Sequence, residues 1–465
     1  MKRISELKAT HGWYIGIASV FMLVLTALAA YFAEARIYFM DMSFQQVLLL
    51  ADKTFSINYF RPGAIIPQVF PLLAIYAHVP LHSVTIIHST GMMLFYLALF
   101  LFILFYFQNT LFALVLLAYL TVVSNHAFYW CQSEYQQGMA WLCVYGAWLF
   151  SQPGDETKFS FRLTNVLLMI WVQFFHPLIV FPMGFMLAYW LLKPSFAFNK
   201  STWFWMLAMV GVFMLRIAVG LLSPYEASHF GPGADFFQHL LHPLQTPSIL
   251  QFLIGLRFEY AGWLVLYLLG SYLLFIKKSW WRLALQTLLP VGYILFILLC
   301  YPKPFAYYEE SMLLPAGFMV AIPVLDACLQ RPQSPAFAIL MTVFLAFRIW
   351  AIWETHPKYT NRLTTLKTVV ETYTAPGRSK VIVPRQHLPL EELMNNSDFL
   401  SYETLLWSTD HQGKGKIVLA EWNPGELQWV YGNTTDMITI WKNRPLQMLD
   451  TFYFHLNHDP YIKTE

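Results

Sequence analysis

The sequence predicts an all-α polytopic membrane domain followed by a small extracytoplasmic α/β domain. Hydrophobic residues make up 57% of the 465 positions and charged residues only 12%, which is about half the charged share of a soluble domain. The charge is also unevenly placed, because residues 353–465 hold 24 of the 55 charged residues. We therefore expect a transmembrane domain over residues 1–352 and a soluble domain over residues 353–465, with the boundary near Trp353–Pro357.

Eleven apolar stretches are candidates for membrane-spanning helices, each of which needs about 20 mostly apolar residues. They are residues 13–33, 83–107, 109–124, 138–150, 163–175, 177–192, 202–222, 251–276, 283–300, 312–329 and 335–352. The stretch Leu163–Leu192 is interpreted as two short helices that meet at His176-Pro177, because proline lacks a backbone donor and ends or kinks a helix. One continuous kinked helix is the alternative, and it would invert the orientation of all later spans.

Basic residues predict the orientation, because lysine and arginine concentrate in short cytoplasmic loops. With a turn at His176, one side receives 11 of the 18 basic residues in the membrane domain, and the other side receives 9 of its 13 acidic residues. The N-terminus is then cytoplasmic and the C-terminal domain extracytoplasmic. The lean loops and short tails favour a bacterial inner membrane, with the C-terminal domain in the periplasm. A net charge of +3 does not indicate a nucleic-acid partner.

The C-terminal domain alternates β-like and helix-like runs, separated by turn signals such as Ala375-Pro376-Gly377. The β-like runs are Lys380–Val383, Lys416–Glu421 and Met437–Trp441, and the helix-like runs are Asn361–Tyr373 and Leu390–Phe399. This alternation predicts a small α/β domain. It contains no GxGxxG, P-loop, GxSxG or HExxH motif.

The long loops lie on the outer side, from Ala33 to about Leu81 and from Ser223 to Ser248, and loops of this length are usually functional. Within the first, the amphipathic stretch Phe44–Leu50 suits a helix on the membrane surface. Asp41 precedes it, and its carboxylate can accept a proton from a hydroxyl or amine. The alternative is a solvated loop aspartate. Glu134 lies on the next outer loop, and the short loops should bring both carboxylates over the same bundle.

This layout resembles the GT-C superfamily of integral-membrane glycosyltransferases. The run from Asp41 through Arg61-Pro62 to Phe70-Pro71-Leu72-Leu73 is similar to the family's first external loop, which carries an acidic residue soon after the first span. Leu163–Leu192 resembles its paired short helices, and Tyr307–Pro315 resembles its late external loop. Two features depart from the family: Met42 stands where many members have a second acidic residue, and Tyr-Tyr-Glu-Glu lacks the arginine often found before its tyrosine.

The resemblance implies inverting transfer of a sugar from a polyprenyl-phosphate-linked donor in the membrane to a glycan, lipid or protein acceptor. Asp41 would be the base and Glu134 would position the acceptor. The expected substrate-binding residues are Arg61, His176, Lys303, Arg257, Tyr307 and Glu309. Polyprenyl phosphate is a good leaving group, so no cofactor is expected. A divalent metal is compatible with this chemistry but is not indicated, because His239 and His242 lack acidic or cysteine partners at ligand spacing.

Two other functions remain open. A transporter or flippase of a lipid-linked or anionic substrate would also explain the arginines inside predicted spans, Arg216, Arg257 and Arg348, because a charge there is by default functional. Transporters usually contain internal repeats, and none is evident here. A non-catalytic assembly protein that kept the fold is the third hypothesis.

Overall fold

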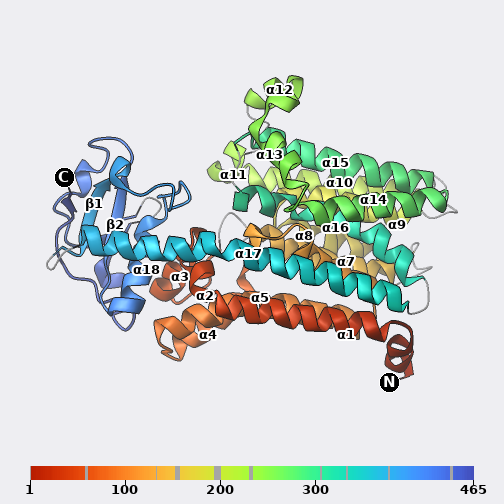
Figure 1. Cartoon of the computed structure of the whole chain (residues 1–465), viewed down its shortest axis with the longest axis horizontal. Helices are drawn as coiled ribbons and strands as arrows, with labels where there is room; N and C mark the ends of the chain where they lie inside the picture. Colours follow the sequence, from red (N-terminus) through yellow and green to blue (C-terminus); the bar gives the residue numbers. More distant parts are fainter. Residues whose placement is uncertain are drawn as a thin grey trace.

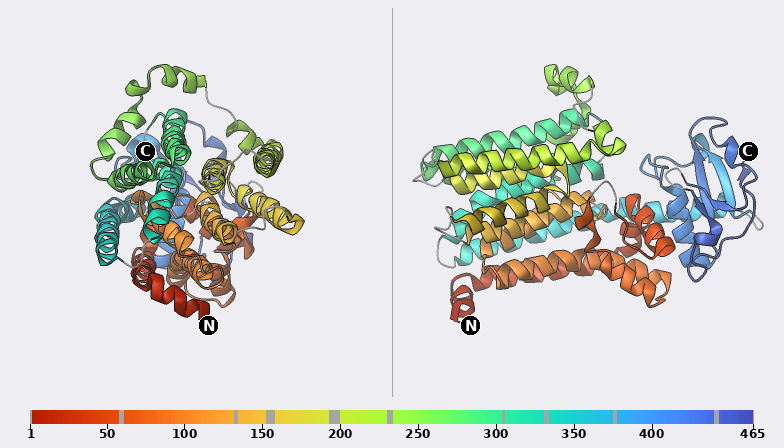
Figure 2. Two further views of the ribbon diagram at one scale, coloured as in Figure 1. Left: turned by 90° about the vertical axis from the view of Figure 1, so that its right-hand side faces the viewer. Right: turned by 180° about the vertical axis from the view of Figure 1, so that it is seen from behind.

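The computed structural model describes residues 2–57, 61–131, 134–151, 158–192, 200–229, 234–303, 306–330, 334–374, 378–439 and 443–464. The chain is mostly helical. The long helices run along the long axis of the molecule, and a small α/β unit lies at one end of this bundle (Figure 1). The N-terminus lies at the opposite end, as the view from behind also shows (Figure 2).

The helices of the first 192 residues are α1 (Lys2–Tyr31), α2 (Ala33–Ile37), α3 (Asp41–Asp52), α4 (Val69–Tyr76), α5 (Leu81–Phe105), α6 (Thr110–Thr121), α7 (Glu134–Phe150), α8 (Phe159–Gln173) and α9 (Val180–Leu191). The later helices are α10 (Lys200–Gly220), α11 (Pro224–His229), α12 (Ala234–Leu241), α13 (Pro247–Gly255), α14 (Ala261–Ile276), α15 (Trp280–Cys300), α16 (Ala306–Leu329), α17 (Pro335–Tyr373) and α18 (Leu400–Gln412).

Among the described residues, six helices are long and apolar enough to cross a membrane. These stretches are His11–Tyr31, Leu81–Phe105, Thr202–Gly220, Trp280–Cys300, Tyr308–Leu329 and Pro335–Tyr373. Thr110–Thr121, Pro177–Leu191 and Ala261–Ile276 are shorter apolar helices. By length and composition, the chain is therefore a multi-pass membrane protein.

A turn at His176 separates α8 from α9. His176 has an extended backbone and precedes the short 3-10 helix η3 (Pro177–Ile179), in which Pro177 takes the first position. Proline is suited to that position because it has no N–H that the helix would need. The region predicted as paired short helices therefore contains two helices with a turn between them.

The C-terminal unit contains a parallel sheet with strand order β2-β1-β5. Its strands are β1 (Lys380–Pro384), β2 (Ile417–Glu421) and β5 (Ile462–Lys463), and β3 (Asp436–Met437) pairs with β4 (Arg444–Pro445) in a second, antiparallel pair. Lys380 is in register with Ile417. Val381 and Val383 pack against the end of α17, whereas Ile382 belongs to the main core, as the alternation of strand side chains requires.

Two expectations for this region, a helix and a strand, need correction. The helix predicted over Leu390–Phe399 is wrong: most of these residues form turns, and α18 begins at Leu400. Met394 and Asn395 have positive φ, and asparagine is among the residues that tolerate this conformation. The boundary near Trp353–Pro357 falls inside α17, which continues for 39 residues with Pro357 in its interior. The predicted strand Met437–Trp441 reduces to β3, and its residues 440–442 lie outside the described ranges.

Helix α3 does not lie open on a membrane surface, because the C-terminal unit covers it. Its Val47, Leu49 and Leu50 are buried, and the Phe44 ring packs edge-on against Tyr402 of α18 with centroids 5.2 Å apart. Its end forms ion pairs with the C-terminal unit. These join Asp52 to Arg444 and Lys53 to Asp450, the latter at 3.1 Å.

Candidate active site

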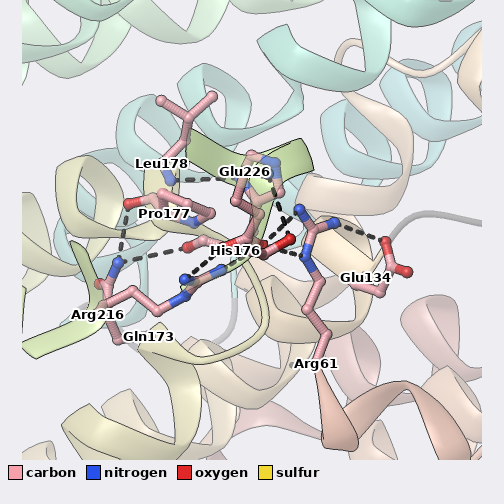
Figure 3. A network of polar contacts seen from close by, with 9 residues as sticks. Arg61, Glu134, Gln173, His176, Pro177, Leu178, Arg216 and Glu226 are labelled. Atoms are coloured by element: carbon pink, nitrogen blue, oxygen red, sulfur yellow. Dashed lines mark hydrogen bonds and ion pairs between the residues drawn. The ribbon is translucent and has the colours of Figure 1, made fainter. Parts of the chain in front are cut away.

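Two arginines and two glutamates form a compact ionic network at the end of the bundle nearest the α/β unit (Figure 3). Arg216 of α10 donates two hydrogen bonds of 2.7 Å to Glu226 of α11. Arg61 donates to the same carboxylate at 3.1 Å and, through Nη1, to Glu134 at 3.1 Å. Two guanidinium groups therefore converge on the single carboxylate of Glu226.

Local sequence explains how Arg61 reaches this network. The residue immediately precedes the 3-10 helix η1 (Pro62–Ile65). At Gly63 a Cβ atom would lie 2.0 Å from the ring of Phe175, so only glycine allows the loop to approach the α8–α9 turn this closely. Glu134 occupies the first turn of α7, where the helix dipole favours a negative charge.

The network retains its charges in spite of burial. Burial alone would lower the pKa of Arg61, but Glu134 and Glu226 outweigh it and raise the pKa. For Glu226, burial alone would raise the pKa, and the hydrogen bonds and charges of Arg216 and Arg61 lower it below its usual value. Both groups are consequently ionised at neutral pH, and a buried charge cluster of this kind depends on each of its partners.

His176 lies beside the network with its ring stacked on Tyr135, at a centroid distance of 4.5 Å. Its Nδ1 accepts a hydrogen bond from the Leu178 amide at 3.3 Å. Gln173 stabilises the turn by donating to the Pro177 carbonyl at 2.8 Å. Burial, with the nearby charges of Arg61 and Arg216, lowers the pKa of His176 well below its usual value, so the imidazole is neutral at pH 7.

Asp41 is the first residue of α3, and its Oδ2 accepts a hydrogen bond of 3.2 Å from the indole N–H of Trp130. Burial and the charge of Glu134 raise the pKa of Asp41 to about 7, against the opposing effect of the Trp130 hydrogen bond. Trp130 also packs against Tyr308 of α16, with ring centroids 5.3 Å apart. A carboxylate with a pKa near the operating pH is well suited to general-base catalysis.

The C-terminal unit holds the backbone just before Asp41. Met40 has a φ of 48°, a conformation that costs a non-glycine residue on the order of 1–3 kcal/mol. Glu403 of α18 accepts a 2.8 Å hydrogen bond from the Met40 amide. Its other oxygen accepts from Arg362 of α17 at 2.5 Å, and both side chains are buried. Sequence patterns did not identify this pair.

Three of the remaining predicted site residues, Lys303, Arg257 and Glu309, have no recorded contact with the network in the described part of the chain. Lys303 and Arg257 are exposed, and Arg257 lies in the turn after α13, outside the helices that could span. Glu309 is buried in the first turn of α16, where its carboxylate has no hydrogen-bond partner among the described residues. The side chain of Tyr307 lies outside the described part of the structure.

Glu226 and Arg216 are network members missing from the predicted site residues. The sequence indicates Arg216 as one of three arginines inside predicted spans that could hold a lipid-linked phosphate, and it indicates Glu226 only as one of the acidic residues on the outer side. They are ten residues apart across the end of α10, and this short separation is the one local signal that could have predicted their ion pair.

Comparison with known proteins found no matching family model, no matching curated protein and no matching solved structure. Function is therefore inferred from the chemistry of the side chains in the site.

Proposed function

We propose that this protein is a membrane glycosyltransferase that transfers a sugar from a polyprenyl-phosphate-linked donor to an acceptor at the extracytoplasmic face. The observation that carries the proposal is the convergence of Arg61 and Arg216 on one carboxylate, Glu226, at 3.1 and 2.7 Å. Glu134 connects this pair to Asp41, through its ion pair with Arg61 and its charge effect on the Asp41 pKa.

The two guanidinium groups are suited to hold the donor phosphate. Arginine presents a planar set of N–H donors that matches the oxygens of carboxylate and phosphate alike. Glu226 occupies the position in which such an oxyanion would bind. It belongs to the short helix α11, in the long loop after α10. In our proposal the donor phosphate displaces Glu226 and takes its place between Arg61 and Arg216.

The chemistry then needs a base and a stabilised leaving group. Asp41 accepts the proton of an acceptor hydroxyl or amine as the acceptor atom attacks the anomeric carbon of the sugar. The bond from that carbon to the phosphate oxygen breaks, and polyprenyl phosphate departs with the electron pair. The arginines stabilise the charge that develops on this phosphate. Glu134 orients Arg61, and the neutral imidazole of His176, whose Nδ1 accepts the Leu178 amide, can donate from Nε2 to the bound groups.

We further propose that eleven helices cross a bacterial inner membrane: α1, α5, α6, α7, α8, α9, α10, α14, α15, α16 and α17. The opposite positions of the N-terminus and the α/β unit (Figure 1) support an odd number of crossings. With a cytoplasmic N-terminus, the α/β unit and the ionic network would face the periplasm. The short helices α6, α8 and α9 would then cross together with the irregular segments at their ends.

A cysteine at Lys414, an exposed residue of the C-terminal unit, is expected to react with a membrane-impermeant maleimide in intact spheroplasts. A cysteine at Lys278, exposed between α14 and α15, should react only after lysis. Both variants are made in a background lacking the four native cysteines. The reverse pattern, with Lys414→Cys labelled only after lysis, would reject the proposed orientation.

Replacing Glu226 by glutamine is expected to strengthen binding of polyprenyl phosphate by roughly ten-fold, which corresponds to about 1.4 kcal/mol. The substitution removes the internal anion that competes with the phosphate but keeps its shape. Binding is measured with protein in nanodiscs and a fluorescent polyprenyl phosphate. Glu371→Gln is the matched control, because Glu371 is exposed and contacts only Lys367 at 4.0 Å among the described ion pairs. Equal or weaker binding by Glu226→Gln would show that the arginines are not the phosphate site.

The transporter hypothesis depended on arginines within spans, and their contacts support other roles. Arg348 donates to the Thr121 carbonyl at 2.9 Å and to Asn125 at 2.7 Å, contacts that join α17 to the end of α6. Arg216 belongs to the network beside Asp41. The non-catalytic hypothesis is tested by the activity of Asp41 variants, because only an enzyme would lose turnover when Asp41 is replaced.

A further inference from the structure

A second polar cluster lies where the first external segment meets the C-terminal unit. Glu34 of α2, His82 in the first turn of α5, and Asp410 and His411 in the last turn of α18 contribute to it. His82 Nδ1 lies 3.1 Å from Asp410 Oδ2 and 3.5 Å from Glu34 Oε1. The second oxygen of Glu34 lies 3.1 Å from His411 Nε2. None of these residues belongs to the network around Arg61.

The spacing of these atoms suits a tetrahedral metal ion. The ligand atoms of Glu34, His82 and Asp410 all lie within 4.8 Å of one another. Zinc binds nitrogen and carboxylate oxygen at about 2.0–2.2 Å, so neighbouring ligand atoms in a tetrahedral site are about 3.3 Å apart. The distances from His82 Nδ1 to Asp410 Oδ2, 3.1 Å, and to Glu34 Oε1, 3.5 Å, lie on either side of this value.

The charges of the cluster also favour a cation. The Asp410 side chain is only 6% exposed, and it accepts a 2.7 Å hydrogen bond from the Tyr38 hydroxyl. An almost buried carboxylate needs a positive partner, and a second carboxylate, that of Glu34, points toward the same imidazole. A divalent ion would neutralise the charge of both carboxylates. Tyr38 would then orient Asp410, as outer hydrogen bonds commonly orient metal ligands.

We propose that Glu34, His82 and Asp410 bind a zinc-class divalent ion that fastens the C-terminal unit to the membrane bundle. An imidazole ligand favours zinc and similar ions, whereas magnesium and calcium prefer sites made of oxygen atoms. The three ligands come from α2, α5 and α18, and α18 is far from the other two helices in the sequence. The metal therefore stabilises the docked position of α18.

A metal at this site would also help to position the backbone before Asp41. Glu403, which holds the Met40 amide, and Asp410 are seven residues apart on α18, and residues at this spacing lie on one face of a helix. A metal at Asp410 would thus hold the same face that positions the backbone before Asp41. The metal inference itself does not depend on the proposed glycosyl transfer.

The test uses full-length protein in detergent at pH 7.5, stripped with EDTA and then supplied with zinc, magnesium or calcium. We expect zinc alone to bind in a 1:1 ratio by competition with a chromogenic chelator, and to raise the thermal unfolding midpoint. His82→Asn retains a polar group near the Nδ1 position but removes the imidazole. Because loss of even an outer partner weakens metal binding by about 10–100-fold, this variant should bind zinc at least about 100-fold more weakly.

His242→Asn is the matched control, because His242 is an exposed histidine outside the cluster, and it should retain the full zinc response. Loss of zinc binding in His82→Asn alone supports the site. The inference is overturned if zinc leaves the midpoint of the wild type unchanged, or if His82→Asn responds to zinc as the wild type does. A midpoint that rises only on acidification would likewise overturn it, because it would assign the cluster to ion pairs with protonated histidines.

Discussion

Turnover of a polyprenyl-phosphate-linked sugar is expected to fall by about 10²–10⁴-fold when Asp41 is replaced by asparagine, the range typical of lost general-base catalysis. Asparagine keeps the size of the side chain and can still accept the Trp130 N–H, so folding should be almost unaffected. When the native acceptor is absent, water can attack the anomeric carbon in its place, so hydrolytic release of polyprenyl phosphate by purified protein in nanodiscs measures turnover. A panel of polyprenyl-phosphate-linked hexoses and pentoses supplies the donor.

The pH dependence gives a second readout of the same residue. Because the base must be deprotonated and burial raises the pKa of Asp41 to about 7, the rate should rise with pH through about 7 and then level off. The asparagine variant should lose this dependence. Asp326→Asn is the matched control. Asp326 is also partly buried, and it accepts a 2.8 Å hydrogen bond from the hydroxyl of Tyr189. It lies near the C-terminal end of α16, whereas Tyr308, which packs on Trp130, lies near the N-terminal end. Full turnover by Asp41→Asn at native expression levels would exclude Asp41 as the base.

Truncation of Glu403 to alanine is expected to destabilise the protein by about 3–5 kcal/mol, the usual effect of removing one partner from a buried ion pair. Arg362 would keep its charge in a buried position, and its remaining hydrogen-bond acceptors among the described residues would be the carbonyl groups of Leu393 and Asn396. The Met40 amide would lose its acceptor at the same time. The unfolding midpoint of the full-length protein, followed by intrinsic fluorescence in detergent, measures the effect. Glu371→Ala, at an exposed position of α17, should change stability by no more than about 0.5 kcal/mol.

The variant Glu403→Gln distinguishes two roles of Glu403: positioning Asp41 and stabilising the fold alone. Glutamine keeps an oxygen that can accept the Met40 N–H, so this variant should recover more donor turnover than Glu403→Ala at matched folded fraction. Its rate should retain the wild-type pH dependence, because Asp41 itself is intact. Equal turnover of folded Glu403→Ala and wild-type protein would show that α18 does not position Asp41.

The sequence predicted the parts of the candidate site that lie close to the ends of apolar segments. Glu134 begins α7 and His176 lies between α8 and α9, and short connections leave little freedom in where such residues lie. Arg61 and Asp41 were predicted from the charge pattern of the long first loop instead. The structure places Arg61 and Glu134 in one ionic network, with His176 beside it. The change in charge density after residue 352 likewise predicted a separate C-terminal unit, because charged residues are concentrated where water is.

Contacts between distant segments could not be predicted in this way. Glu403 is 363 residues from Met40, and no periodicity or motif connects them. The amphipathic pattern of α3 specifies that one face is buried, but a lipid surface and a covering helix satisfy it equally well. Lys303 and Arg257 were expected at the site because of their charge and their side of the membrane, and neither property determines the direction of a side chain.

The central claim, that Arg61 and Arg216 bind a lipid-linked phosphate beside Asp41, is tested most directly by a cryo-EM structure of the protein in nanodiscs with polyprenyl phosphate. We predict that the phosphate lies within hydrogen-bond distance of both guanidinium groups, with Glu226 displaced and Asp41 facing the phosphate. A phosphate bound elsewhere, with Glu226 still held by Arg61 and Arg216, would contradict this account.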